Sequence, residues 1–317
     1  MIEQVAVIGS GYMGGGIAQV FALAGREVRI ADVSAERAIQ SRERIIGEAA
    51  DYAKRGLFPE DAADRVAARV TAADSIEEAV REVDFIEEAV PELVPIKHQT
   101  LARISAACRA DALIGSNTST ISIATLAEAV VAPERFLGIH FSNPAPFIPG
   151  VEVIPHATTR AGAADEVIAL LAEVGKLGVE VADVTGFVLN RLQYALFSEA
   201  ARLVEEGVAS AEAVDTITRT TFGYRLPFFG PFAIADMAGL DVYAFCYDSL
   251  SEGYPERFSA PRQLTEKVAE GDLGVKSGRG FLATSPEKLA DLVAHRDTAY
   301  AAMSKLLAEL GEAPVTY

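Results

Sequence analysis

The most restrictive feature of the sequence is a glycine-rich turn close to its start. Residues 5–8 form a short β-branched run, residues 9–14 follow the pattern Gly-x-Gly-x-x-Gly, and apolar residues then recur at helical spacing. A second strand-like run covers residues 27–32 and ends in a carboxylate. Strand, turn, helix and strand make up a βαβ unit, which is typical of parallel sheets covered by helices. The sequence therefore predicts an α/β domain of the doubly wound type.

The three glycines of the turn have separate physical roles. Gly9 permits the tight turn, Gly11 lets the backbone approach a pyrophosphate, and Gly14 permits close packing of the helix on the strand. The N–H groups at the start of that helix are free to bind an anion. Asp32 ends the second strand at the spacing expected for a carboxylate that binds a ribose diol. Asp32 alone could equally be a helix N-cap, but with the glycines in register it favours a dinucleotide.

The cofactor expected at this turn is NAD. A carboxylate at position 32 would repel the 2′-phosphate of NADP, and residues 33–35 supply no arginine to bind it. We expect Tyr12 and Met13 to contact the cofactor together with the glycines.

The remaining pattern divides the chain in two. Residues 34–70 form a charged helical pattern interrupted at residues 56–59, which predicts a helical hairpin. Short apolar runs then alternate with helical stretches, at residues 84–87, 112–115, 136–139, 150–154 and 178–183. Beyond residue 184 the patterns are long and helical, over residues 187–207, 210–222, 233–250 and 285–310. We expect a Rossmann-type doubly wound domain over residues 1–184, followed by a smaller all-α domain over residues 185–317.

Composition limits the partners and the location. The 28 basic and 45 acidic residues give a net charge of −17, which disfavours nucleic acid and anionic membrane surfaces. The start of the chain has no basic flank, and no apolar run is long enough for a membrane span, so we expect a cytoplasmic protein. The two cysteines, Cys108 and Cys246, are too far apart in sequence to suggest a metal cluster and are expected to be buried thiols. No metal site is expected among the histidines either.

The candidates for proton transfer lie near the middle of the chain. His140 follows the apolar run 136–139, and the carboxyl end of a strand is where doubly wound sheets place their ligands. A neutral imidazole suits removal of a hydroxyl proton near neutral pH. Glu152, in the next strand-like run, could bond the far ring nitrogen. The alternatives are that His140 is a satisfied core histidine and that Glu152 faces solvent.

Together these motifs resemble the L-3-hydroxyacyl-CoA dehydrogenase family over nearly the whole chain. The resemblance rests on the glycine turn with Asp32, on residues 116–119 (Ser-Asn-Thr-Ser), on residues 140–144 with Glu152, and on residues 186–191. It implies an NAD-binding domain, a helical domain that forms a homodimer, and an active site in the cleft between the domains.

The resemblance also implies roles for single residues. It makes His140 the general base and Glu152 its carboxylate partner, while Ser119 binds the substrate hydroxyl and Asn190 contacts the reacting end of the substrate. Three further residues fall on family positions that touch the nicotinamide half of NAD, namely Glu92, Lys97 and Asn143. The implied reaction converts the secondary alcohol of an L-3-hydroxyacyl-CoA or related 3-hydroxy acid to the 3-oxo compound.

Other motifs point to a branch of the family that acts on small substrates. Residues 186–195, 203–207 and 147–149 resemble the L-gulonate 3-dehydrogenase (lambda-crystallin) branch. Residues 229–241 and 274–280 are similar to bacterial members that act on small free acids, including a pyridine alcohol dehydrogenase. The substrate is then a free hydroxy acid or alcohol such as L-gulonate or a pyridine alcohol. A non-catalytic NAD-binding structural protein is the alternative of another class.

Charged residues bear on this choice of substrate. Lys54 and Arg55 could bind CoA phosphates or be ordinary solvated charges. Arg191 and Arg225 are the candidate anchors for a free carboxylate, with the alternative that Arg191 only caps or braces its helix.

Overall fold

The computed structural model describes residues 2–282, 288–311 and 313–315. Packing divides the chain into two compact units, unit 1 (Met1–Ala195) and unit 2 (Leu196–Tyr317). The helical pattern expected from residue 185 therefore begins inside unit 1. The domain boundary after residue 184 stays a prediction.

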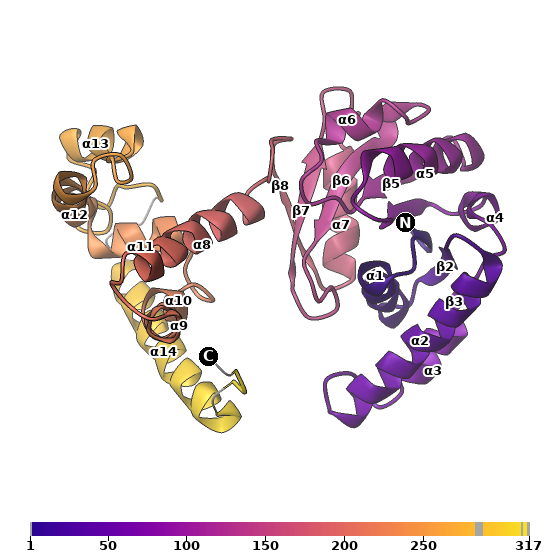
Figure 1. Cartoon of the computed structure of the whole chain (residues 1–317), viewed down its shortest axis with the longest axis horizontal. Coiled ribbons are helices and arrows are strands. Elements are labelled where there is room, and N and C mark those ends of the chain that lie inside the picture. Colours follow the sequence, from indigo (N-terminus) through magenta and orange to yellow (C-terminus); the bar gives the residue numbers. More distant parts are fainter. Residues whose placement is uncertain (1, 283–287, 312, 316–317) are drawn as a thin grey trace. The chain divides into compact units, whose positions relative to one another are not determined.

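Unit 1 is built on one eight-stranded sheet with the strand order β3-β2-β1-β4-β5-β6-β7-β8 (Figure 1). Neighbouring strands are parallel except for β6 and β7, which are antiparallel. The strands are β1 (Gln4–Ile8), β2 (Glu27–Ala31), β3 (Val70–Ala72), β4 (Phe85–Glu88), β5 (Leu113–Ser116), β6 (Phe136–Phe141), β7 (Gly150–Pro155) and β8 (Leu177–Glu180). This arrangement confirms the predicted Rossmann-type sheet.

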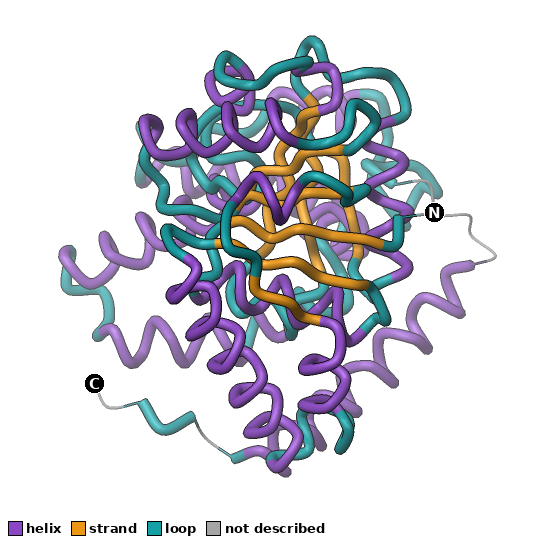
Figure 2. Tube along the Cα trace, turned by 90° about the vertical axis from the view of Figure 1, so that its right-hand side faces the viewer, coloured by secondary structure: helices purple, strands orange, loops and turns teal. Residues whose placement is uncertain are grey.

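Helices cover both faces of the sheet, whose strands are drawn in orange among the purple helices in Figure 2. One face packs against α1 (Tyr12–Leu23), α2 (Ala35–Lys54), α3 (Ala62–Arg69) and α7 (Ala163–Glu173). The other face packs against α4 (Ile76–Val80), α5 (Val94–Ala107) and α6 (Ile123–Ala127), and a 3-10 turn, η1 (Pro133–Arg135), precedes β6. Helices α2 and α3 form the predicted hairpin. The sequence did not indicate β3, because a strand of three residues is too short to show an alternating pattern.

Unit 2 is helical, as predicted for the C-terminal part. Its helices are α9 (Ala211–Thr220), α10 (Phe222–Arg225), α11 (Pro231–Ala238), α12 (Leu240–Gly253), α13 (Arg262–Ala269) and α14 (Leu289–Leu310), while α8 (Leu189–Glu205) starts in unit 1. The helix predicted over residues 233–250 is broken at Gly239, which has a φ of 103°. Helix α13 was not predicted, and residues 285–287 of the last predicted helix lie outside the described residues.

Two sequence motifs of unit 2 pack against each other around Asp236. Its buried carboxylate accepts hydrogen bonds from the N–H groups of Phe281 (3.0 Å) and Leu282 (2.7 Å). A Cβ atom on Gly280 would lie 2.3 Å from Asp236 Oδ1, so only glycine fits there. The motifs over residues 236–241 and 274–280 therefore contribute to packing.

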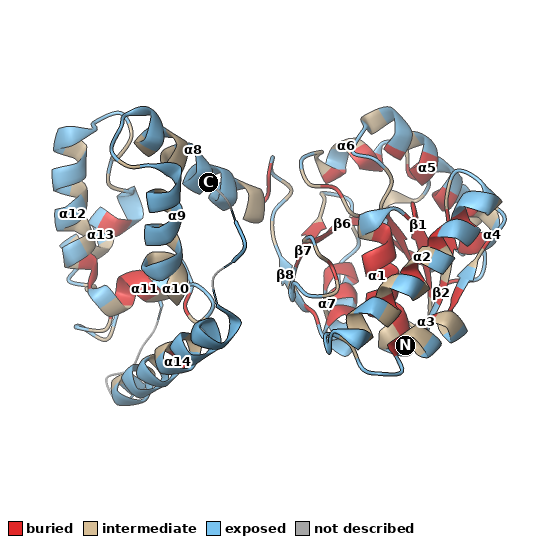
Figure 3. Cartoon of the chain, turned by 60° about the horizontal axis from the view of Figure 1, so that its bottom comes forward, coloured by how far each residue is buried: buried red, intermediate tan, exposed pale blue. Residues whose placement is uncertain are grey.

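Burial differs between the units (Figure 3). Buried residues concentrate in the sheet of unit 1, whereas the core of unit 2 is small and its helices are largely exposed. Cys108 is half-buried and Cys246 is exposed, so the expectation of two buried thiols was wrong. None of the helices in the described part of the chain is both long and apolar enough to cross a membrane.

Glu87 is an unusual residue of the unit 1 core. It lies fully buried in β4 on the α1 face, and neither carboxyl oxygen has a hydrogen-bond partner among the described residues. A Cβ atom on Gly115 of β5 would lie 2.3 Å from Glu87 Oε2, so that glycine leaves room for the carboxyl group. Burial, and to a lesser extent the neighbouring Glu88, raises the pKa of Glu87 well above its ordinary value.

The substitution Glu87→Gln should make the stability of unit 1 less sensitive to rising pH. Above the ordinary pKa of 4.5, the unfolded chain releases the Glu87 proton while the folded protein keeps it. The wild-type free energy of unfolding should then fall by about 1.4 kcal/mol per pH unit until the raised pKa is passed. Glutamine does not ionise, so the free energy of unfolding of the variant should fall less as the pH rises. Urea unfolding at about pH 5 and about pH 8 measures the difference.

The matched control is Glu82→Gln, since Glu82 is exposed in the same segment and should leave the wild-type pH dependence unchanged. An equal loss of stability between the two pH values in wild type and Glu87→Gln would contradict the prediction.

Candidate active site

The glycine turn has the geometry of a ligand cradle. Gly9 has a φ of 92°, and a Cβ atom on it would lie 2.7 Å from the Ala89 carbonyl. A Cβ atom on Gly14 would lie 1.9 Å from the Gly9 carbonyl oxygen. By contrast, a Cβ atom on Gly11 would meet nothing within 4 Å. Packing therefore requires the first and third glycines, while the second keeps open space beside the backbone, as approach of a pyrophosphate would need.

A cavity of about 650 Å³ opens at this turn. It lies at the carboxyl ends of β1, β2 and β4, where doubly wound sheets bind their ligands. Its lining includes five of the predicted cofactor residues, Gly9, Gly11, Tyr12, Met13 and Asp32. The residues present thus fit a bound dinucleotide.

Asp32 is oriented by its neighbours in the turn. Its Oδ2 accepts hydrogen bonds from the Ser10 N–H (2.9 Å) and the Ser10 hydroxyl (2.6 Å), and its Oδ1 accepts one from the Val33 N–H (2.8 Å). Burial raises the pKa of Asp32, but these hydrogen bonds outweigh burial, and the pKa lies below its ordinary value. The group is therefore a fixed carboxylate, suited to a ribose diol and repulsive to a phosphate.

The predicted proton-transfer residues lie together on the face of the sheet that packs against α4, α5 and α6. In the antiparallel register of β6 and β7, His140 is paired with Glu152, and their side chains are cross-strand neighbours. His140 Nδ1 is 2.8 Å from Glu152 Oε2, and His140 Nε2 is 3.1 Å from the Ser119 hydroxyl oxygen. A carboxylate only accepts hydrogen bonds, so Nδ1 carries the proton and Nε2 is left as an acceptor.

The start of helix α8 completes this group. The second oxygen of Glu152 accepts hydrogen bonds from the N–H groups of Val188 and Leu189, both at 2.9 Å. The Asn190 side-chain amide donates to the Ser119 carbonyl oxygen at 2.8 Å. Phe187, buried with a φ of 48°, places its ring 5.9 Å from the His140 ring. A left-handed non-glycine residue is strained, and such strain is common at functional sites.

Glu92 holds the loop that carries Ser119. Its Oε1 accepts hydrogen bonds from the Thr118 hydroxyl (2.7 Å) and from the N–H groups of Ser119 (2.8 Å) and Thr120 (3.0 Å). Burial raises the pKa of Glu92, but these bonds outweigh it and leave the pKa below its ordinary value. Whether Glu92 also contacts NAD stays a prediction.

Lys97 is fully buried in a polar network behind the same loop. Its Nζ lies 2.9 Å from Glu88 Oε1, 3.4 Å from the Asn117 carbonyl oxygen and 3.6 Å from Glu92 Oε2. The Ser116 hydroxyl donates to Glu88 Oε2 at 2.6 Å. Lys97 thus supports the loop, and its predicted contact with NAD stays a prediction, as does that of Asn143, which is exposed after β6.

Sequence reasoning missed three supports of this site. Glu88 was not singled out, because it follows another glutamate in the same strand. Its place at the carboxyl end of β4, where doubly wound sheets bind ligands, could have indicated it. Asn117 Oδ1 accepts a hydrogen bond from the Phe141 N–H at 2.8 Å, which ties the loop to β6. Asp183 caps α6 by accepting hydrogen bonds from the Ser122 hydroxyl and the amides of residues 123 and 124. No cluster of His, Cys, Asp and Glu suited to a metal occurs in the described ranges.

Comparison with known proteins covers both units. Residues 4–184 match the family model described as 3-hydroxyacyl-CoA dehydrogenase, NAD binding domain, and residues 186–284 match the one described as 3-hydroxyacyl-CoA dehydrogenase, C-terminal domain. A probable 3-hydroxybutyryl-CoA dehydrogenase of Bacillus subtilis (strain 168) is 37% identical over 88% of this chain and 96% of its own length.

Two further matches span nearly the whole chain. The 5-formyl-3-hydroxy-2-methylpyridine 4-carboxylate 5-dehydrogenase of Mesorhizobium japonicum is 34% identical over 97% of this chain and 99% of its own length. A solved structure of a 3-hydroxyacyl-CoA dehydrogenase from Archaeoglobus fulgidus superimposes with a TM-score of 0.79 at 32% identity, and covers 98% of this chain and 99% of that one.

The substitution Asp32→Ala should weaken NAD binding and reduce discrimination against NADP. Loss of the carboxylate removes the proposed acceptor for the ribose hydroxyls and the charge that repels a 2′-phosphate. We expect the dissociation constant for NAD to rise by about tenfold or more, the equivalent of about 1.4 kcal/mol. Isothermal titration calorimetry with both cofactors measures this. An unchanged NAD affinity would contradict the ribose contact.

Proposed function

Because the chain belongs to the 3-hydroxyacyl-CoA dehydrogenase family, we propose that His140 is the general base with which it oxidises a secondary alcohol. The protein is an NAD-dependent oxidoreductase that acts on CH–OH groups. Its reaction class converts an L-3-hydroxyacyl-CoA or related 3-hydroxy acid to the 3-oxo compound. The observation that carries the proposed roles is the hydrogen-bonded chain from Ser119 through His140 to Glu152.

We infer one task for each side chain, and the geometry supports these inferences. A substrate hydroxyl that binds at His140 Nε2 and the Ser119 hydroxyl can give its proton to Nε2, which is an acceptor in this tautomer. Glu152 keeps Nδ1 protonated and stabilises the imidazolium that forms. Asn190, fixed by its bond to the Ser119 carbonyl oxygen, orients the Ser119 loop. When bound, NAD supplies the acceptor for the hydride that leaves the carbinol carbon.

A free hydroxy acid or pyridine alcohol is the second candidate substrate. Lys54, one of the two cations considered for CoA phosphates, is exposed and lies 2.9 Å from Asp51, which offsets its charge. Arg225 lines a cavity of about 420 Å³ in unit 2, and a guanidinium group is suited to binding a carboxylate there. The 5-formyl-3-hydroxy-2-methylpyridine 4-carboxylate 5-dehydrogenase of Mesorhizobium japonicum also matches 97% of the chain. A relation to the L-gulonate branch and a cytoplasmic location remain predictions of the sequence.

The substitution His140→Gln should lower turnover by about 10²- to 10⁴-fold, the usual contribution of a general base. NAD affinity should stay at the wild-type value, because His140 is outside the cavity at the glycine turn. NAD reduction is followed by absorbance with a panel of L-3-hydroxyacyl-CoA esters, L-gulonate, other 3-hydroxy acids and pyridine alcohols. The wild-type protein should be active on one class of the panel, and that class identifies the substrate.

The matched control is the variant His98→Gln. His98 forms a hydrogen bond with a backbone carbonyl of α6 outside this site, so this variant should keep the activity of wild type. Near-normal turnover of His140→Gln would overturn the role of the base. Binding of NAD without activity on any member of the panel would favour the non-catalytic alternative.

We also propose that the protein forms a homodimer through unit 2. Helices α8 and α9 contain no buried residue, and Phe197, Val208 and Ile217 are 66%, 60% and 61% exposed. A second copy of the chain would remove this apolar surface from water. Sedimentation velocity at micromolar concentration should give the mass of a dimer for wild type and for the control Glu82→Lys, an exposed position in unit 1, and a smaller mass for Phe197→Glu. A wild-type monomer would refute the proposal.

A further inference from the structure

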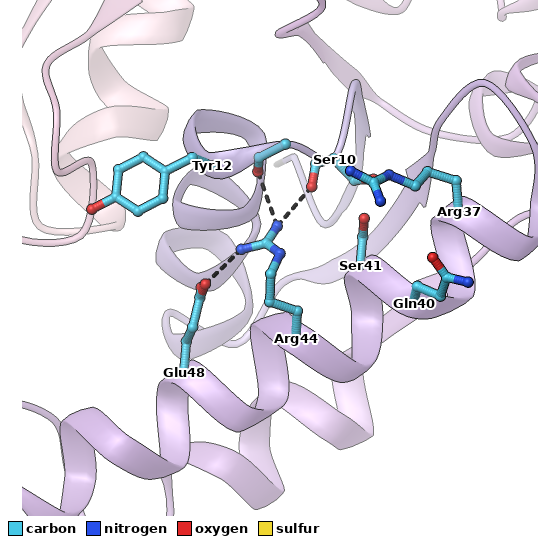
Figure 4. Close-up of a pocket in the computed structure, with 8 residues that line it drawn as sticks. Ser10, Tyr12, Arg37, Gln40, Ser41, Arg44 and Glu48 are labelled. Carbon is cyan, nitrogen blue, oxygen red and sulfur yellow. Dashed lines mark hydrogen bonds and ion pairs between the residues drawn. The ribbon is translucent and has the colours of Figure 1, made fainter.

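The outer side of the glycine turn is held by an arginine that the sequence did not single out. Arg44, in the middle of α2, donates from Nη2 to the carbonyl oxygens of Ser10 (2.8 Å) and Gly11 (3.1 Å). Its Nη1 donates to Glu48 Oε1 at 2.7 Å. Figure 4 shows the guanidinium group between the turn and Glu48, in a recess that Arg37 and Ser41 also line. The guanidinium group is thereby held in one orientation by three acceptors.

These bonds determine which way the turn presents its amide groups. In a planar trans peptide the C=O and N–H groups point in opposite directions. Because Arg44 holds the Ser10 carbonyl on its own side, the N–H group of Gly11 points to the other side. The Gly11 carbonyl accepts from Arg44 and also from the Gly15 N–H (2.8 Å), and these two bonds together direct the Tyr12 N–H the opposite way. These N–H groups belong to the free ones at the start of α1. Gly11 and Tyr12 also line the cofactor cavity, so their amides are available to an anion there.

Ser10 links this arginine to the ribose-binding carboxylate. Its N–H and hydroxyl groups both donate to Asp32 Oδ2, while its carbonyl accepts from Arg44. Ser10 is therefore held from both sides, at its N–H and hydroxyl groups by Asp32 and at its carbonyl oxygen by Arg44. Loss of the Arg44 side chain would therefore alter the orientation of the amides that face the pyrophosphate and the hydrogen bonds between Ser10 and Asp32.

Gly15 leaves the space that the Arg44 guanidinium group occupies. A Cβ atom there would lie 2.8 Å from Arg44 Nη2, 3.3 Å from Nη1 and 3.2 Å from Ile45 Cγ1. Glycine destabilises a helix interior relative to alanine, and α1 carries glycines at residues 14–16. At position 14 any side chain would clash with the Gly9 carbonyl oxygen, whereas at position 15 it would clash with the Arg44 guanidinium group.

We propose that Arg44 is a positioning residue for NAD, which orients the Ser10 and Gly11 peptides so that the amides of the turn face the pyrophosphate. Glu48 pairs with the guanidinium group, so the effect on NAD comes from the orientation of the peptides and not from an added charge. The proposal rests on NAD as the cofactor and is independent of the roles of His140 and Glu152.

The substitution Arg44→Met tests the proposal, since it keeps the stem of the side chain and removes its donors. We expect the dissociation constant for NAD, measured by calorimetry, to rise by about tenfold, which corresponds to about 1.4 kcal/mol. KM for NAD should rise in parallel, while kcat at saturating NAD stays near the wild-type value. Arg44→Lys, which can still donate to one carbonyl, should lie between the two. A dissociation constant within about twofold of wild type would overturn the proposal.

Arg42→Met is the matched control for a purely structural effect. Arg42 lies on the same helix and also donates to two carbonyls, those of Val70 and Ala67 at 2.6 Å each, but these are outside the turn. We expect this variant to unfold at a lower temperature and to keep its NAD affinity. If it weakens NAD binding as much as Arg44→Met does, Arg44 acts through general stability and the proposal fails.

A double-mutant cycle with Gly15→Ala separates the positioning effect from helix stability. In the wild-type background the new methyl group should displace the guanidinium and raise the dissociation constant for NAD. In the Arg44→Met background the same change should have little further effect on binding, and alanine should raise the unfolding temperature. Equal effects of Gly15→Ala on NAD affinity in both backgrounds would overturn the proposal.

Discussion

The carboxylate of Glu152 is the group on which the proposed catalytic half of the site depends. One of its oxygens accepts the Nδ1 proton of His140, and the other accepts the first amides of α8. The antiparallel register of β6 and β7 places Glu152 opposite His140, so the sheet alone brings the pair together. The same carboxylate then binds the start of the helix that carries Asn190. The hydrogen bond to His140 and the contact with the start of α8 therefore share one carboxylate, through its two different oxygens.

The Ser119 loop depends on a group of charges, of which Lys97 and Glu88 are out of contact with water. A buried ion pair such as Lys97 with Glu88 gains little net stability, because desolvation of both groups offsets their attraction. Here the pair is completed by the Ser116 hydroxyl, the Asn117 carbonyl and the second carboxylate, Glu92. Such a network specifies one conformation of the loop more than it stabilises the fold. Glu87, the adjacent residue of β4, faces the opposite side of the sheet and has no such partners among the described residues, which shows how strongly strand alternation separates the two environments.

Much of this arrangement could be predicted from local pattern. The Gly-x-Gly-x-x-Gly turn predicts strand, turn and helix because the first and third glycines are required by local packing. The antiparallel pairing of β7 with β6 places Glu152 opposite His140, only twelve residues earlier in the chain. Supports formed by residues distant in sequence, without a motif, could not be predicted: Arg44 reaches a turn more than thirty positions earlier, and Asp183 caps a helix about sixty positions earlier. Lys97 was predicted as a contact residue, yet only the structure shows its burial against Glu88. The break at Gly239 was missed because the apolar spacing continues across it, while the backbone takes a positive φ.

The two halves of the site are built by the same physical device. At Ser10 and Gly11, Arg44 binds the carbonyls, and the amides on the other side of the peptides are left for a ligand. At Ser119, Glu92 accepts the backbone N–H and Asn190 donates to the carbonyl, so that the hydroxyl, bonded to His140, is the group left to meet a substrate. In both places the supporting side chains bind the backbone from behind and take up the polar groups that would otherwise compete for the ligand. Preorganisation of this kind lowers the cost of binding, because the groups that meet the ligand are already oriented when it arrives. It follows that affinity and rate at this site depend on residues that need not touch the cofactor or the substrate.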